Sequence, residues 1–141
     1  MRFLIFVFAA SIALVGVDIQ SSGAQKLLTS DEAAKVLRFD NLNVSTNSIS
    51  GMLVNTSPHR VKDIELLIQY HWLWDNETHP GQDSPGRTFT LKLDKELSPG
   101  GTLPFSYRPP QLTQRSDGRF MPEVDIGGFA VVIPQQRSAQ R

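Results

Sequence analysis

The chain has 141 residues, of which 40% are hydrophobic and 20% are charged. These proportions fit one ordinary globular domain, and they exclude a disordered low-complexity chain and a multispanning membrane protein. Lys plus Arg and Asp plus Glu each total 14, so no net charge attracts nucleic acid or anionic lipid, and the absence of cysteine excludes disulfides, thiol nucleophiles and cysteine-ligated zinc.

Residues 1–24 have the features of a signal peptide. Arg2 places a positive charge ahead of an apolar run over residues 3–17, and small residues of the kind that a signal peptidase recognises follow as far as Ala24. We expect cleavage after Ala24, which makes the protein periplasmic or secreted, without membrane insertion after cleavage. A retained anchor is the alternative, although the run is shorter than the roughly 20 residues that a spanning helix needs.

Residues 25–38 are expected to form a lead-in that covers one end of the domain. Thr29 and Glu32 have the spacing of a capping box, and they stand directly before the apolar residues Ala33 and Ala34. This pattern predicts one short helix or turn.

From residue 39 onward the apolar residues repeat with a period of two, and turn residues recur at short intervals, as in antiparallel strands. The predicted fold class is all-β, an immunoglobulin-like antiparallel β-sandwich of about seven strands over residues 39–133, followed by a disordered tail at residues 134–141. Gly51 is expected to mark a bulge or a close-packing point. The strands that the pattern locates lie near residues 39–45, 48–55, 61–74, 87–93, 103–107 and 124–133, and long loops are expected at residues 75–86 and 111–122.

The clearest strand runs from Val61 to Trp74. Its alternation assigns Trp72 and Trp74 to the core face with the aliphatic residues, and it assigns His71 to the outer face. Core packing is favoured for both tryptophans, with Trp74 partly exposed at the strand end. The alternative is an aromatic platform for a sugar ring or a peptide.

A series of residues gives the chain a resemblance to a known family. Leu73, Trp74 and Asp75 match the last three positions of the signature of bacterial FxLYD-type immunoglobulin-like envelope domains, whereas His71 replaces its phenylalanine. The resemblance covers roughly residues 49–107. It implies an extracytoplasmic interaction or accessory module, and it implies no catalytic residues. Its other matching positions are Ile49, Gly51, Val54, Asn55, Leu97, Pro99, Gly100, Leu103 and Phe105.

One cluster of polar residues resembles a set of metal ligands. Its members are Asp75, Asn76, Glu77, His79 and Asp83, on the loop predicted at residues 75–86. Their spacing fits no standard calcium or zinc site, and the same residue types are common in solvated turns. We therefore predict no metal at this loop.

The sequence contains no recognisable pair of nucleophile and base. The three histidines, His59, His71 and His79, are candidate bases, but none stands in a catalytic motif such as a nucleophile elbow. We therefore predict no catalytic residues, no enzyme activity and no cofactor.

The favoured function is that of a non-catalytic protein-interaction or accessory module of the cell envelope, whose partner is another envelope or secreted protein. An unpaired sheet edge or the two long loops would make the contact. The alternative is a carbohydrate or small-ligand binding domain that uses Trp74, His71 and the adjoining loop. The candidate binding surface consists of His71, Trp74, Asp75, Asn76, His79, Arg115 and Arg119.

Overall fold

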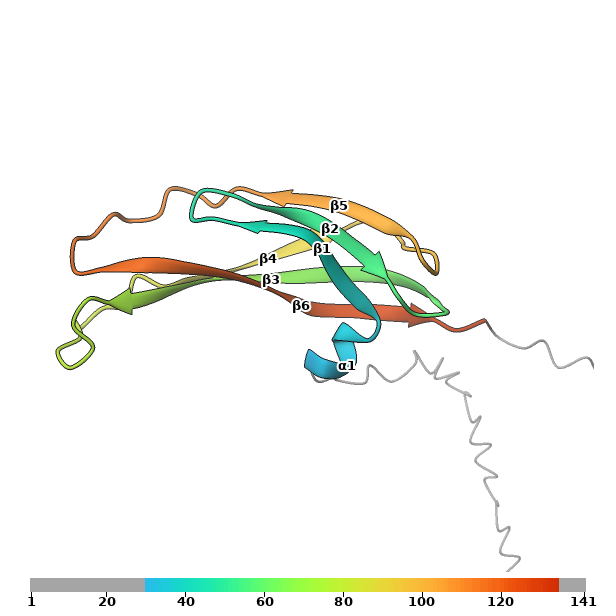
Figure 1. Cartoon of the computed structure of the whole chain (residues 1–141), viewed down its shortest axis with the longest axis horizontal. Coiled ribbons are helices and arrows are strands. Elements are labelled where there is room, and N and C mark those ends of the chain that lie inside the picture. Colours follow the sequence, from blue (N-terminus) through green and yellow to red (C-terminus); the bar gives the residue numbers. More distant parts are fainter. Residues whose placement is uncertain (1–29, 135–141) are drawn as a thin grey trace, which may run out of the picture.

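The computed structural model describes residues 30–134. The predicted signal peptide, the Thr29 cap and residues 135–141 of the predicted tail lie outside these described residues. Within them, one short helix precedes six strands (Figure 1): α1 (Ser30–Ala34), β1 (Leu37–Val44), β2 (Ile49–Asn55), β3 (Arg60–Trp74), β4 (Arg87–Leu93), β5 (Thr102–Tyr107) and β6 (Gly118–Val132).

The strands form two three-stranded antiparallel sheets, with the order β1-β2-β5 in one and β4-β3-β6 in the other. The two sheets face each other as layers (Figure 1). The predicted all-β class and antiparallel pairing are therefore confirmed. The described residues contain six strands, where about seven were expected.

The helix is short and acidic at its start. Asp31 and Glu32 occupy the first turn of α1, while Ala33 is buried. Negative side chains in the first turn favour a helix because they face the positive end of its dipole. None of the described helices is long and apolar enough to cross a membrane.

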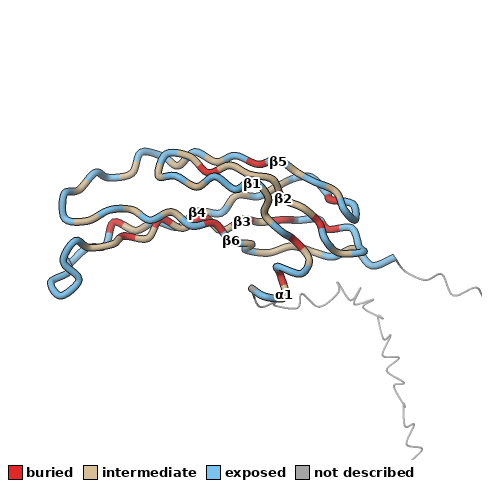
Figure 2. Tube along the Cα trace, viewed as in Figure 1, coloured by how far each residue is buried: buried red, intermediate tan, exposed pale blue. Residues whose placement is uncertain are grey.

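Alternation of side chains along the strands creates the core. Successive side chains of a strand point to opposite faces, so every second residue of β3 from Ile64 onward faces the other sheet, while the bulge at Asp63 keeps Val61 on the same face. Figure 2 shows buried positions along the strands of both layers. Each fully buried aliphatic side chain stabilises the fold by roughly 1.5–3 kcal/mol. The buried cluster comprises Leu37, Ile49, Leu53, Val61, Ile64, Leu66, Ile68, Tyr70, Leu97, Phe105 and Val124.

Asn55 is a buried polar residue in this apolar setting. Its Nδ2 donates to the carbonyl oxygens of His59 (2.7 Å) and Leu97 (3.0 Å), and its Oδ1 accepts from the backbone N–H (3.0 Å) and the hydroxyl (2.7 Å) of Ser57. The backbone carbonyl of Asn55 also accepts from the N–H of Gly100 at 2.8 Å. One side chain thus joins the β2–β3 turn to the β4–β5 connection.

Gly51 is a close-packing point. A Cβ at Gly51 would lie 3.2 Å from Leu42 Cδ1 and 3.3 Å from Phe105 Cε1, so a larger side chain would crowd the neighbouring strands β1 and β5. Gly51 also lies at a bulge, because the β1–β2 register passes from Asp40↔Met52 to Asn43↔Ser50 and leaves Asn41 (φ 50°) and Leu42 opposite Gly51. Both alternatives predicted for Gly51, a bulge and a close-packing point, therefore apply.

The last strand begins earlier than the sequence pattern indicates. The predicted loop at residues 111–122 is wrong at its end, because β6 starts at Gly118 and pairs with β3 as far as Trp74. The mostly polar composition of residues 111–122 favoured a loop, and Pro122 is tolerated in the edge strand β6 because its missing N–H need not pair with a neighbour. As a result, the paired ends of β3 and β6 extend beyond the opposite sheet (Figure 1).

Candidate functional site

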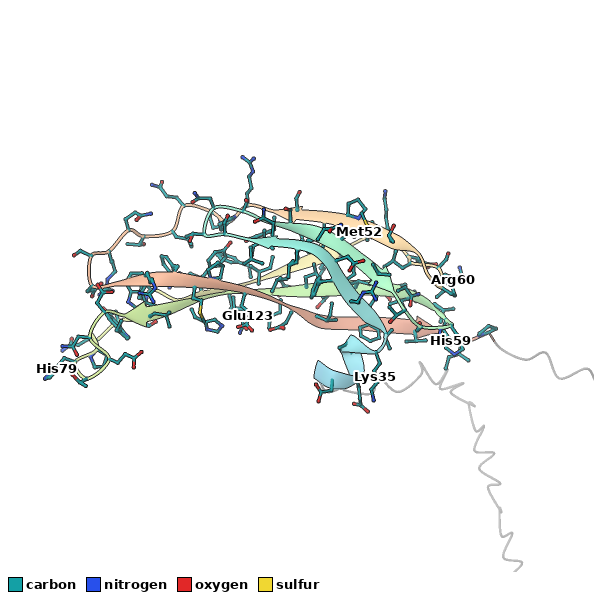
Figure 3. The ribbon with its side chains drawn as sticks, viewed as in Figure 1. Lys35, Met52, His59, Arg60, His79 and Glu123 are labelled. Atoms are coloured by element: carbon teal, nitrogen blue, oxygen red, sulfur yellow. The ribbon has the colours of Figure 1, made fainter. Side chains whose placement is uncertain are left out.

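The candidate site is the end of the molecule where β3 and β6 extend beyond the other sheet. We call it the loop end, and it comprises residues 75–86, residues 108–117, the adjoining ends of β3 and β6, and the β1–β2 turn at residues 45–48. His79 marks its tip in Figure 3, at the opposite end of the molecule from Arg60. The two longest connections of the described chain lie here.

An aromatic cluster forms the base of the loop end. The strand register places Phe120 opposite Trp72 and Gly118 opposite Trp74, so the three rings share the inner face of the sheet. The Trp72 ring centroid lies 4.8 Å from that of Phe120 and 6.0 Å from that of Trp74, both in edge-to-face geometry. Such pairs stabilise a cluster beyond the area that they bury.

Gly118 is required by this packing. A Cβ at Gly118 would lie 2.7 Å from Trp72 Cε2 and would also collide with the carbonyl oxygen of Leu73. Glycine at this position therefore allows β6 to approach the edge of the Trp72 indole. The expected exposure of the tryptophans is confirmed, because Trp72 is buried and Trp74 is half-buried.

Arg115 connects the two loops to the aromatic cluster. Its guanidinium carbon lies 5.3 Å from the ring centroid of Trp74 and 5.7 Å from that of Trp72. Its Nη1 donates to the carbonyl oxygen of Asp83 at 2.9 Å, while Nε donates to Asp117 Oδ1 at 2.9 Å and Nη2 donates to Asp117 Oδ2. We call this set of contacts the Arg115 clamp.

A backbone hydrogen bond and the negative charge of Asp117 stabilise the Arg115 clamp. The N–H of Asp75 donates to the carbonyl oxygen of Asp117 at 3.0 Å, which closes the end of the β3–β6 pair. The hydrogen bond from Arg115 lowers the pKa of the Asp117 carboxyl, and the same bond raises the pKa of Arg115. Both groups are therefore charged at neutral pH.

Three polar residues of the loop at residues 75–86 form hydrogen bonds with one another. Asn76 Oδ1 accepts from the backbone N–H (3.2 Å) and the hydroxyl (2.7 Å) of Thr78, and the Thr78 hydroxyl lies 2.9 Å from His79 Nδ1. These contacts form a local turn. Within residues 30–134, no three His, Cys, Asp or Glu side chains converge as metal ligands would.

His71 lies away from the rest of the predicted surface. Its Nε2 lies 2.9 Å from Glu123 Oε2 on the outer face of the sheet, with side chains 41% and 51% exposed, and Figure 3 shows Glu123 pointing away from the other sheet. Trp74 is three positions further along β3, so its side chain faces inward. The structure thus brings Trp74, Asp75 and Arg115 together and leaves His71 on the opposite face.

A cavity of about 390 Å³ opens beside the aromatic cluster, and a smaller one of about 130 Å³ adjoins it along the β1–β2 turn. Arg119, an exposed residue of β6, contributes to the wall of the larger cavity. The residues that line the larger cavity come from segments far apart in the sequence. For this reason the sequence alone did not identify most of them. They are Thr46, Asn47, Trp72, Thr113, Gln114, Arg115, Gly118, Arg119 and Phe120.

Two buried polar atoms on the inner face of β3 have no hydrogen-bond partner among the described residues. They are the Tyr70 hydroxyl and Trp72 Nε1. Both belong to the part of β3 that approaches the loop end.

Comparison of the chain with protein-family models, with curated proteins and with solved structures finds no match.

Proposed function

We propose that the chain is an exported, non-catalytic binding module of the cell envelope with an immunoglobulin-like sandwich fold. Its loop end binds another envelope or secreted protein. The single observation that carries this proposal is the Arg115 clamp, which joins the two longest connections to a partly buried aromatic cluster.

The clamp matters because a loop that is ordered before binding loses less conformational entropy on binding. Residues 75–86 and 108–117 would be free to move independently if nothing crossed between them. Arg115 connects the two loops, because it donates hydrogen bonds to Asp83 in one loop and to Asp117 in the other. Loops held on a rigid sandwich are a frequent location of recognition surfaces.

The composition of the loop end also supports recognition. Tryptophan and arginine are the residue types most enriched among the contacts that dominate binding energy. Here Trp74 is half-buried at the strand end, with Arg115 over its ring, and neither is part of the main apolar core. A surface with these residues can supply both apolar contact and hydrogen bonds to a partner.

The extracytoplasmic setting is supported by the sequence. The signal peptide predicted at residues 1–24 would export the domain, and the positions that give the resemblance to FxLYD-type envelope domains include Asn55 and Gly100. A backbone hydrogen bond of 2.8 Å joins Asn55, at the end of β2, to Gly100 in the β4–β5 connection. The resemblance therefore includes positions with a clear stabilising role.

Affinity capture tests the proposal. The full chain, immobilised and exposed to envelope and secreted extract of its source organism, is expected to retain a specific protein. The Arg115→Ala variant should lose that protein, whereas Arg60→Ala, which removes an exposed arginine from the opposite end, should retain it. Equal retention by both variants would place the binding surface outside the loop end, and no retention by the unmodified chain would overturn the proposal.

A further inference from the structure

Each of the two sheets ends in two edge strands, and β4 differs from the other three edges. β1 contains the bulge opposite Gly51, while β5 contains Pro104 and β6 contains Pro122. A bulge bends a strand and a proline lacks an N–H group, so both hinder the pairing of a further strand. β4 contains neither, and it pairs with β3 in unbroken register along Arg87–Leu93. It therefore presents a regular edge to which a strand can be added.

The outer edge of β4 has backbone groups without partners. In an antiparallel ladder, the N–H and C=O groups of alternate residues point to opposite sides of the strand. Among the described strands, β3 alone pairs with β4, and residues 87–93 make no other backbone-to-backbone hydrogen bond there. Alternate backbone groups of β4 are therefore directed away from the sheet, where a further strand can bond to them.

Two apolar side chains of β4 are only partly covered. Phe89 and Leu91 pack against the core, yet each is half-buried. The Phe89 ring lies between those of Tyr70 and Tyr107, with centroids 6.0 Å and 5.8 Å away. Apolar residues of an added strand, directly opposite Phe89 and Leu91, would cover their exposed parts, and such cross-strand pairs stabilise a sheet.

The charge of β4 indicates the kind of strand that fits. Residues 87–93 include Arg87 and Lys92 and no acidic residue. Arg87 is exposed and takes part in no described ion pair, and its Nη1 donates to the carbonyl oxygen of Gly86. The Lys92 side chain is 75% exposed and lies 3.5 Å from Glu65 Oε1, and an exposed pair of this kind contributes little. A second copy of β4 would double the positive charge of this edge, whereas a strand with acidic residues would balance it.

We infer that β4 receives an extended segment of another protein as a further strand, and that this segment carries one acidic residue opposite Lys92 and another opposite Arg87. The added strand runs antiparallel to β4, as the paired strands of both sheets do. From the residue opposite Lys92 onward, its order is acidic, apolar, polar, apolar, polar, acidic. This inference goes beyond the proposed function, since β4 shares no residue with the loop end.

Hydrogen exchange of the full chain labelled with nitrogen-15, followed by nuclear magnetic resonance, provides the test. The probe is the capped peptide Glu-Val-Thr-Val-Thr-Glu, which has the inferred order. Lys-Val-Thr-Val-Thr-Lys is the charge-reversed control, and Glu-Val-Pro-Pro-Thr-Glu is the proline control. Because successive N–H groups of a strand point to opposite sides, one of the two N–H groups that the prolines remove would face β4.

We expect the acidic peptide to bind in a saturable manner and to slow amide exchange within residues 87–93. The charge-reversed peptide should bind about tenfold more weakly, because like charges would then lie opposite each other at two positions. The proline peptide should give no protection of β4, since it cannot complete the ladder.

A charge-reversing variant makes the test specific. Lys92→Glu should weaken binding of the acidic peptide about fivefold and strengthen binding of the charge-reversed peptide. Arg38→Glu makes the same reversal on β1, an edge of the other sheet, and should change neither.

The inference is overturned if the acidic and charge-reversed peptides bind alike, if the two variants behave alike, or if the proline peptide protects β4 equally. Protection that appears at the loop end and not at residues 87–93 would also overturn it. Protection of β4 that rises with the concentration of the chain alone would assign this edge to a second copy instead. None of these results would affect protein capture that depends on Arg115, so the two proposals fail separately.

Discussion

Asn55 shows what a single buried polar residue contributes to this fold. Its amide makes two donor and two acceptor contacts, and the residue is fully buried. Alanine at this position would leave the carbonyl of Leu97 and the N–H of Ser57 without these partners. The cost of unsatisfied buried groups is high compared with the net value of an ordinary hydrogen bond.

We therefore expect Asn55→Ala to lower the free energy of unfolding by about 3 kcal/mol, measured by denaturant titration with tryptophan emission. Asn43→Ala is the matched control, because Asn43 is an exposed residue of β1. Its effect should stay within about 0.5 kcal/mol. A loss of similar size in both variants would contradict the role assigned to Asn55.

Asp117 makes the Arg115 clamp sensitive to acid. The bond from Arg115 holds the pKa of the Asp117 carboxyl below its ordinary value in the folded chain. The contribution of this pair to the order of the loop end is therefore complete above the unfolded pKa of aspartate, about 3.9, and is lost as the pH falls through the lower folded pKa.

Tryptophan emission reports this change, because both tryptophans contact Arg115. We expect the emission to be constant from about pH 8 to about pH 5 and to change only below about pH 4. Asp117→Asn should abolish this acid-dependent step, since the amide does not titrate. A step of unchanged size in Asp117→Asn would assign it to another group.

At the scale of elements, the close approach of β6 to β3 depends on Gly118. Gly118→Ala would force Cβ against Trp72 Cε2, so we expect a loss of about 1–3 kcal/mol in the free energy of unfolding and altered tryptophan emission. Gly128→Ala, in the same strand, is the control, because a Cβ there would meet no atom within 4 Å. Thermal unfolding of the two variants checks the difference, and equal melting temperatures would contradict it.

The edges of the two sheets are protected to different degrees. β1 contains a bulge near Asn41, β5 contains Pro104, and β6 contains Pro122, and each of these features hinders the addition of a further strand. β4 pairs with β3 in unbroken register along its seven residues and has neither proline nor bulge. Charged side chains such as Lys92 remain as its protection against edge-to-edge association.

The strands differ in how well their sequences predict them. β3 was located almost to the residue, because Ile64, Leu66, Ile68 and Tyr70 recur with a period of two, and this period is characteristic of a half-buried strand. The start of β6 was missed because residues 111–122 are mostly polar. Its pairing with β3 is stabilised by Phe120 packing on Trp72, a contact between residues 48 positions apart that no local pattern contains.

The same limit applies to the candidate site. Trp74, Arg115 and Arg119 were named from residue type and loop position, and the structure places all three at the loop end. The Arg115 clamp could not be predicted, because it depends on how two long loops meet after the sheets have formed. His71 was assigned to the same surface by its proximity in sequence, although its outward direction followed from the alternation of β3.

At the scale of the whole molecule, the main remaining prediction concerns export. If the signal peptide predicted at residues 1–24 is correct, expression in a bacterial host yields a periplasmic or secreted protein whose first residue is Gln25. Intact-mass measurement of the fractionated protein checks this. A protein of full-length mass in the membrane fraction would instead indicate that the apolar segment is retained as an anchor.

Both ends of the described chain lie away from the loop end. α1 at the start and the last residues of β6 occupy the half of the molecule opposite the extended ends of β3 and β6 (Figure 1). A tether attached at either terminus, whether a fused neighbouring domain or the surface of a biosensor chip, would therefore hold the loop end outward. The orientation of the molecule on its support is set by the path of the chain, and swapping the attachment from one terminus to the other would leave the same surface free.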